Sequence, residues 1–156
     1  NVDVIHTHGV LEHLEDPNNF LSLAKKTLKK KGLIFTSVAN DFNQLQSFAL
    51  TQNKNPWWLL PPEHYNYFNI SSIQRVMKKK FKILKMNVSF PLEIFLLMNE
   101  NYIKKKNLGI KIHKQRVSLE KNLNSKSLRY FKENFYKSFL DLKIGRQIDI
   151  ICQNKR

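Results

Sequence analysis

The sequence is short of several features that whole classes of protein require. Its 156 residues include one cysteine, Cys152, which excludes a disulfide framework and any zinc site built from cysteines alone. The longest apolar run, residues 90–98, contains Pro91 and Glu93 and is far too short to span a bilayer. No signal-peptide pattern is present. We therefore expect a reducing cytoplasm as the compartment and no membrane insertion.

Glycine-rich and low-complexity segments are also missing. The chain has four glycines, no GxGxG pattern, no internal repeat and no Pro/Gly/Ser-rich linker, so we expect one domain. Hydrophobic residues make up 42%, with eleven Phe, five Tyr and two Trp, which is enough for a substantial core. Because the chain opens on Asn1 inside a strand-like segment, we expect residues 1–156 to be a piece of a longer domain.

Acidic residues are few beside the basic ones. There are 12 Asp and Glu against 27 Lys and Arg, a net charge of +15, which is compatible with nucleic-acid or anionic-membrane binding. The excess is nearly all Lys, in runs such as 29–31 and 78–80 at expected helix ends, where cations complement the helix dipole. Arginine is sparse and no nucleic-acid-binding motif accompanies the charge. We expect a background charge, with nucleic-acid binding as a minor alternative.

The order of apolar segments predicts an α/β fold. Residues 2–5 and 33–38 are short β-branched or apolar runs, typical of buried parallel strands. Between them, Asp16 as N-cap and Pro17 at the first helical position predict a helix that ends at Gly32. A strand, helix and strand in this order form a parallel, right-handed unit.

The rest of the chain alternates between helices and strands. Side-chain periodicity predicts the remaining elements. They are a short helix and a long loop over 41–60, a helix capped by Ser71 or Ser72, a strand over 84–90, helices around 119–123 and 128–142, and a last strand over 148–152. Ligands of doubly wound folds bind at the carboxyl ends of the parallel strands. The polar segments 6–13 and 39–41 follow those strands and are the expected functional site.

Several short motifs, in a consistent order and spacing, carry a family resemblance. They are residues 3–5 (DVI), 10–17 (VLEHLEDP), 28–34 (LKKKGLI), 38–40 (VAN), 62–68 (PEHYNYF) and 71–73 (SSI). Together they resemble the C-terminal half of class I S-adenosylmethionine-dependent methyltransferases. Within that class they are most similar to the broad group of ubiquinone-type O-methyltransferases and bacterial polysaccharide-tailoring methyltransferases.

The resemblance implies the C-terminal part of a Rossmann-like methyltransferase fold, truncated at the N-terminus. Parallel strands would be followed by a terminal antiparallel strand, and residues 91–146 would form a helical insertion or lid before that last strand. The glycine-rich cofactor loop and the acidic residue that holds the ribose would precede residue 1. We expect residues 1–156 alone to expose one flank of the sheet. We also expect them to bind S-adenosylmethionine weakly or not at all, and to be inactive alone.

The family's cofactor is S-adenosylmethionine, and the implied reaction is methyl transfer to a small-molecule acceptor, with a hydroxyl of a sugar or related metabolite favoured by analogy. Thr7, His8 and Gly9 correspond to the loop that contacts the cofactor, largely through backbone atoms. His64 is the candidate general base for a hydroxyl acceptor. Its alternative role is to hold the loop by bonding a backbone carbonyl.

Five other residues are candidates for binding the acceptor. Asn40 and Asp41 would bind acceptor hydroxyls, or else cap the following helix. Trp57, Trp58 and Tyr67 would wall a sugar or ring, or else pack the loop against the domain.

Glu12 and His13 raise the question of a metal. Some ubiquinone-type relatives bind a divalent ion through an acidic residue three positions before a Glu-His pair, and here that position is Gly9. We therefore expect no metal, and structural hydrogen bonds from both side chains. Two other classes stay open, a catalytically inactive methyltransferase-like binding module and a basic nucleic-acid-binding protein.

Overall fold

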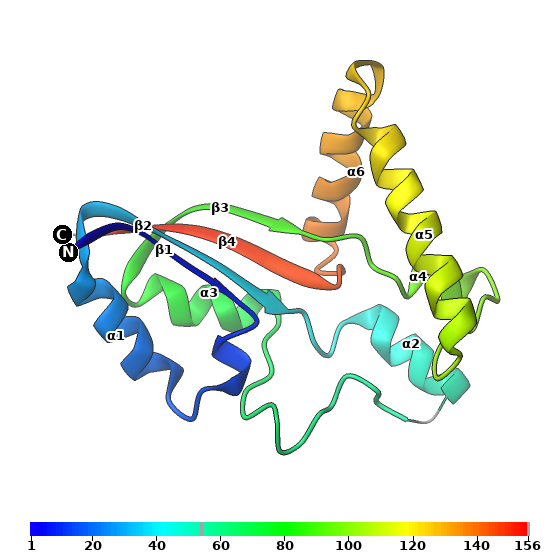
Figure 1. Cartoon of the computed structure of the whole chain (residues 1–156), viewed down its shortest axis with the longest axis horizontal. Coiled ribbons are helices and arrows are strands. Elements are labelled where there is room, and N and C mark those ends of the chain that lie inside the picture. The colour runs from blue at the N-terminus through cyan, green and yellow to red at the C-terminus, as the bar shows by residue number, and fades with distance from the viewer. Residues whose placement is uncertain (54, 156) are drawn as a thin grey trace.

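A computed structural model describes residues 1–53 and 55–155 and shows an α/β fold (Figure 1). The strands of the sheet are β1 (Val2–His8), β2 (Leu28–Ala39), β3 (Phe81–Val88) and β4 (Gln147–Asn154). Their order is β1-β2-β4-β3, with β1 and β2 parallel and β4 antiparallel to both of its neighbours. Parallel strands followed by a terminal antiparallel strand are the predicted fold class, which is confirmed.

Helix α1 (Pro17–Thr27) connects the two parallel strands as predicted. Asp16 is its N-cap, since its Oδ1 accepts a hydrogen bond from the amide of Asn19 at 3.0 Å. The predicted end at Gly32 is wrong, because α1 stops at Thr27 and Gly32 lies inside β2. Asn154, near the far end of the chain, donates hydrogen bonds to the carbonyl groups at the end of this helix. Its Nδ2 donates to the carbonyl of Lys25 and to two carbonyls at the start of β2, all within 3.2 Å.

Two other boundaries also differ from the prediction. The N-cap of α3 (Ile70–Lys78) is Asn69 rather than Ser71 or Ser72. Its Oδ1 accepts a hydrogen bond from the amide of Ser72, and the hydroxyl of Ser72 accepts one from the amide of Asn69, which completes a capping box. Strand β3 begins at Phe81 rather than at residue 84. An irregularity in its pairing between Ile83 and Lys85 turns Leu84 outward, where it is 48% exposed.

The core lies between the sheet and the two helices α1 and α3, which cover the same face (Figure 1). Its fully buried members include Leu21, Ile34, Ile73, Phe81 and Ile150. Strand β1 forms one edge of the sheet, where Val2 and Val4 are exposed, in agreement with the expected open flank.

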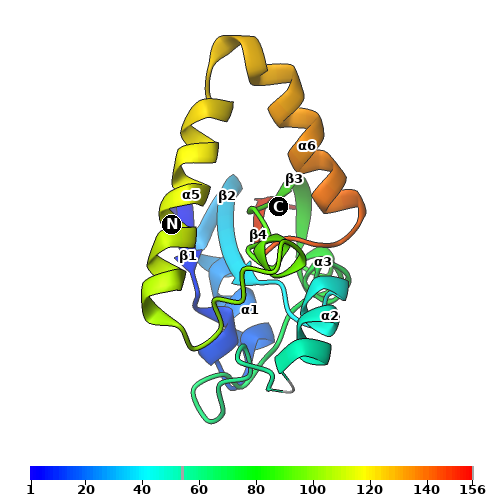
Figure 2. The same ribbon diagram turned by 90° about the vertical axis from the view of Figure 1, so that its right-hand side faces the viewer.

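The remaining helices lie beyond the carboxyl end of β2. The bounds are η1 (Leu11–His13), α2 (Gln44–Asn53), α4 (Ile94–Leu97), α5 (Lys106–Leu123), η2 (Lys126–Leu128) and α6 (Arg129–Asp141). Helices α5 and α6 join at a tip that projects away from the sheet (Figures 1 and 2). A row of rings from Phe131 through Phe135 and Phe139 to Phe90 anchors α6 in the core. In the described residues, no helix has the length and hydrophobicity needed to cross a membrane.

Candidate functional site

The two polar segments predicted to form the site lie together at the carboxyl ends of β1 and β2. The amide of Gly9 donates to the carbonyl of Ser37 at 3.0 Å. The side chain of Glu12, 3% exposed, accepts a hydrogen bond from the amide of Ala39 at 2.8 Å. Since both bonds join the segment after β1 to the end of β2, they hold the two segments in one place.

The backbone at the end of β1, residues 7–9, borders an open space. Thr7 is buried, and its hydroxyl lies 3.0 Å from that of Thr36 on β2. His8 is exposed at the end of the strand. Gly9 has a φ of +58°, and a Cβ built on it would meet no atom of the described residues within 4 Å. The left-handed conformation favours glycine here, and a ligand has room to approach the backbone.

Asn40 and Asp41 are buried at the end of β2, at 1% and 2% exposure. The amide Nδ2 of Asn40 donates to the carbonyls of Lys143 and Gly145, at 3.1 and 2.9 Å, and so ties β2 to the segment before β4. The helix-capping alternative for both residues is wrong. Asn43 caps α2 instead, since its Oδ1 accepts hydrogen bonds from the amides of Leu45 and Gln46 in the first turn of that helix.

Acidic groups gather around Asp41. Burial raises the pKa of Asp41 to about 6, a hydrogen bond with the Gln46 side chain lowers it, and the negative charge of Glu12 adds to the rise. Glu93, 2% exposed, lies 3.9 Å from the guanidinium of Arg146, and burial raises the pKa of its carboxyl group despite that cation. Sequence reasoning placed Glu93 only in the insertion. Its position as a lone carboxylate in an apolar run was the signal that it would be buried beside a cationic partner.

Aromatic rings surround the candidate base His64. Its ring meets that of His13 edge-on at 4.7 Å between centroids, and that of Tyr67 at 5.8 Å. The hydroxyl of Tyr67 accepts a hydrogen bond from the amide of Leu60. Phe42 contacts Tyr67 and Trp58, and Trp58 in turn contacts Trp57. The structure therefore brings His64, Tyr67 and both tryptophans into one aromatic cluster, beside the end of β2.

His13 fills the loop-holding role that was the alternative for His64. Its Nδ1 donates to the carbonyl of Glu63 at 2.7 Å. The carbonyl of Glu12 accepts from the amides of Tyr65 and Asn66, so the loop is docked on η1. Both side chains of the Glu-His pair thus make structural hydrogen bonds. In residues 1–53 and 55–155, no three His, Cys, Asp or Glu side chains are grouped so as to hold a metal ion.

Unpartnered polar atoms mark the same region. In the described chain, the buried side-chain atoms without a hydrogen-bond partner are Glu12 Oε2, Ser37 Oγ, Asn40 Oδ1, Asp41 Oδ2, Trp58 Nε1, His64 Nδ1, Glu93 Oε2 and Tyr102 OH. They come from the segment after β1, the end of β2, the aromatic loop and the segment around α4. Each such group costs about 1–3 kcal/mol when it stays unpaired, so their concentration in one region indicates a site for a ligand.

Fold and site together define an α/β protein with a polar ligand site at the carboxyl ends of parallel strands. Residues 1–80, just over half of the chain, match the family model described as a methyltransferase domain. The chain therefore belongs to this family of methyltransferase domains. Its fold is that of a class I S-adenosylmethionine-dependent methyltransferase.

Two solved structures illustrate the similarity. A SAM-dependent methyltransferase from Archaeoglobus fulgidus shares 15% identity and a TM-score of 0.51, over 98% of this chain and 59% of that one. Phosphoethanolamine N-methyltransferase 2 of Haemonchus contortus, in complex with S-adenosyl-L-methionine, shares 11% identity and a TM-score of 0.46, over 99% of this chain and 33% of that one. The chain thus spans between a third and three fifths of their lengths. No curated protein matches it.

Proposed function

We propose that this chain forms the acceptor side and one wall of the cofactor pocket of a methyltransferase that acts on a hydroxyl group of a sugar or related metabolite. The observation that carries the proposal is the concentration of buried, unpartnered polar atoms at the carboxyl ends of β1 and β2. A family fold whose polar site lies at this edge of the sheet supports the same location.

The cofactor wall is the segment Thr7, His8 and Gly9. The left-handed turn at Gly9 and the open space beside it expose backbone groups to a bound nucleoside. Thr7 is held by Thr36 and keeps the segment in register with β2. When bound, S-adenosylmethionine supplies a methyl group on a sulfonium, which is electrophilic.

The residues proposed to bind the methyl-accepting substrate present mostly oxygen atoms that accept hydrogen bonds. Asn40 Oδ1, Asp41 Oδ2 and Glu93 Oε2 each need a donor, and Trp58 Nε1 needs an acceptor. A polyhydroxyl ligand offers both kinds of group, whereas a ligand without donors would leave the carboxylates unpaired. The rings of Trp57, Trp58 and Tyr67 suit the faces of a sugar.

His64 is the proposed general base. Its imidazole would take the proton of the acceptor hydroxyl, while S-adenosylmethionine, when bound, would supply the methyl group. Among residues 1–53 and 55–155, His64 Nδ1 has no hydrogen-bond partner and His13 already holds the loop, so the imidazole is free for this proton. Most of the rate would come from alignment of the reacting atoms, which the buried hydrogen bonds of Asn40 favour.

The test uses two measurements. The full product of the reading frame that contains these residues is incubated with labelled S-adenosylmethionine and a panel of sugars, quinols and amines. We expect label in sugars, and a loss of about 10²–10⁴-fold in turnover for His64→Ala. The matched control is His113→Ala, an exposed histidine on α5, which should keep full activity. Unchanged turnover in His64→Ala would remove the base assignment and leave the family assignment intact.

The second measurement separates an enzyme from an inactive binding module. Amide NMR spectra of residues 1–156 are recorded during titration with S-adenosylmethionine into the millimolar range. We expect shifts concentrated at Thr7, His8 and Gly9, followed by shifts at Asn40 and Asp41 when a sugar acceptor is added. Sugar-induced shifts without any cofactor-induced shift, together with no label transfer, would indicate the inactive module instead.

A further inference from the structure

The segment 104–143, which consists of the helical hairpin of α5, η2 and α6 and the lysines that flank it, holds most of the excess positive charge. Residues 104–143 contain twelve Lys and Arg against three Asp and Glu, a net charge of +9 out of +15. These residues are about a quarter of the chain, so an even background would give them about a quarter of the charge. The excess is therefore local, and a uniform lysine background does not account for it.

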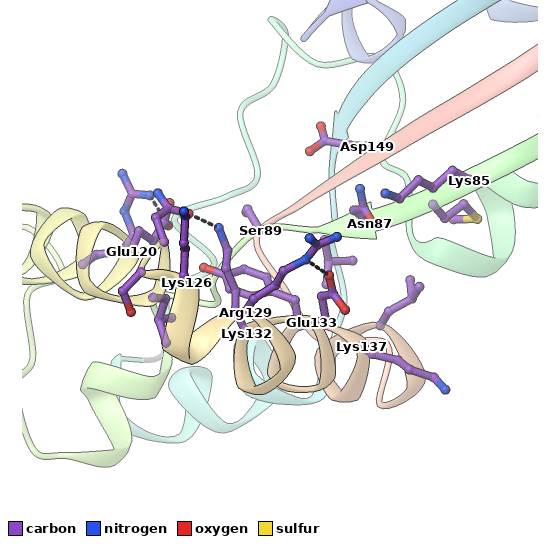
Figure 3. A pocket seen from close by; sticks show the side chains of 18 residues that line it. Lys85, Asn87, Ser89, Glu120, Lys126, Arg129, Lys132, Glu133, Lys137 and Asp149 are labelled. Atoms are coloured by element: carbon purple, nitrogen blue, oxygen red, sulfur yellow. Dashed lines mark hydrogen bonds and ion pairs between the residues drawn. The ribbon is translucent and has the colours of Figure 1, made fainter.

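A cleft of about 870 Å³ lies between this hairpin and strands β3 and β4. In Figure 3, Lys85, Asn87 and Asp149 stand on the strand side, across from Lys126 and Lys132 on the hairpin. The volume is in the range of small-molecule sites. None of the residues proposed above to contact the cofactor or the acceptor lines this cleft.

The lining contains six cationic and three acidic side chains. Its two arginines are already paired along their own helices, Arg116 with Glu120 at 2.6 Å and Arg129 with Glu133 at 3.1 Å. In the part of the chain that the structure describes, none of the four lysines has a carboxylate within 4.0 Å. With Asp149 as the acid left over, the walls carry an unpaired charge of +3.

We propose that this cleft is a second binding site, for a small ligand that carries two or more phosphate groups. Lys85 on the strand wall and Lys126 and Lys132 on the hairpin wall would hold phosphates from opposite sides, as ammonium groups do. Lys132 is oriented by a hydrogen bond to Asn124 Oδ1, and its Nζ lies 5.9 Å from the centroid of the Tyr136 ring. That ring offers an apolar surface to the rest of the ligand.

Two sources supply this chemistry, a soluble diphosphate or triphosphate compound and the headgroup of a phosphorylated lipid. A ligand from either source would fit the size of the cleft and meet lysines on both of its walls. The proposal does not depend on methyl transfer, because it uses none of the residues of the methyl-transfer site. It succeeds or fails separately from that function.

The experiment is a calorimetric titration of the 156-residue chain with sodium triphosphate at low salt and at about 0.3 M salt. We expect saturable binding with a single site, weakened at the higher ionic strength because the partners are partly exposed. The triple variant K85Q/K126Q/K132Q should lose about tenfold or more in affinity. The matched control K30Q/K78Q/K79Q removes the same charge from exposed positions outside the cleft and should lose less than about threefold.

Two further arms locate the ligand and its source. Amide NMR of the wild-type chain should show triphosphate-induced shifts at Ser89 and Asn124, which test the location even where the triple variant unfolds. Vesicles of phosphatidylcholine with phosphatidylinositol bisphosphate, bound by the control but not by the cleft variant, would assign the lipid source. Equal losses in both variants would show attraction by bulk charge alone and overturn the proposal, as would no saturable binding to either probe.

Discussion

Gly145, in the turn that leads into β4, is the position at which the structure most clearly requires glycine. Its φ is +130°, a conformation that L side chains rarely adopt. A Cβ added there would lie 2.6 Å from the Cβ of Val88 and 3.0 Å from the carbonyl oxygen of Ser89. Neither atom is the end of a flexible side chain. We therefore predict that Gly145→Ala destabilises the protein strongly.

The size of the effect follows from two contributions. The backbone conformation costs a non-glycine residue about 1–3 kcal/mol, and forcing an extra carbon into a packed site costs about 1–3 kcal/mol more. A total near 4 kcal/mol corresponds to a fall in Tm of roughly 8–16 °C for a chain of this length. Adding Val88→Ala should not restore stability, because the closest clash is with the Cβ of Val88, which alanine keeps.

Thermal unfolding followed by circular dichroism tests this, with Gly109→Ala as the control. Gly109 lies in α5, and in the part of the chain that the structure describes an added Cβ would meet nothing within 4 Å beyond its own helix turn, so alanine should raise stability by about 0.5–1 kcal/mol. Opposite shifts in the two variants are the expected result. A Tm for Gly145→Ala within about 2 °C of the wild type would refute the reasoning, because that shift corresponds to less than about 1 kcal/mol.

Three further predictions concern the site. Asp41→Asn should stabilise the protein by up to about 3 kcal/mol at pH 7, because folding raises the pKa of the Asp41 carboxyl from 3.8 to about 6 and so makes its charged form costly. The gain should vanish when denaturation is repeated at pH values falling toward about 4, and a pH-independent gain would contradict this. Glu12→Ala should cost about 1–3 kcal/mol in urea unfolding by orphaning the amide of Ala39, whereas Glu12→Gln keeps an acceptor and should cost less. Calorimetry of residues 1–156 with S-adenosylmethionine should show weak or no binding, and micromolar affinity would overturn that expectation.

Local signals predicted most of the fold. The cap at Asp16, the β-branched run before it and the four-residue spacing of α1 all depend on neighbours in the sequence, and all of them are present in the structure. The errors lie where distant residues decide the outcome. The end of α1 is set by Asn154, which reaches the carbonyl of Lys25 across 129 positions. The exposure of Leu84 depends on an irregularity in the pairing of β3 with β4, which no local pattern reveals.

The candidate site shows the same division between local and distant causes. The polar segments after β1 and β2 were predictable, because the fold rule that places ligands at the carboxyl ends of parallel strands needs only the order of elements. The electrostatic surroundings of Asp41 could not be predicted, because the charges of Glu93 and Arg146 that act on it lie 52 and 105 positions later in the chain. The two histidines differ for the same reason. His13 is fixed by a carbonyl 50 residues away, and that contact gives His13 the loop-holding role that the sequence had left open for His64.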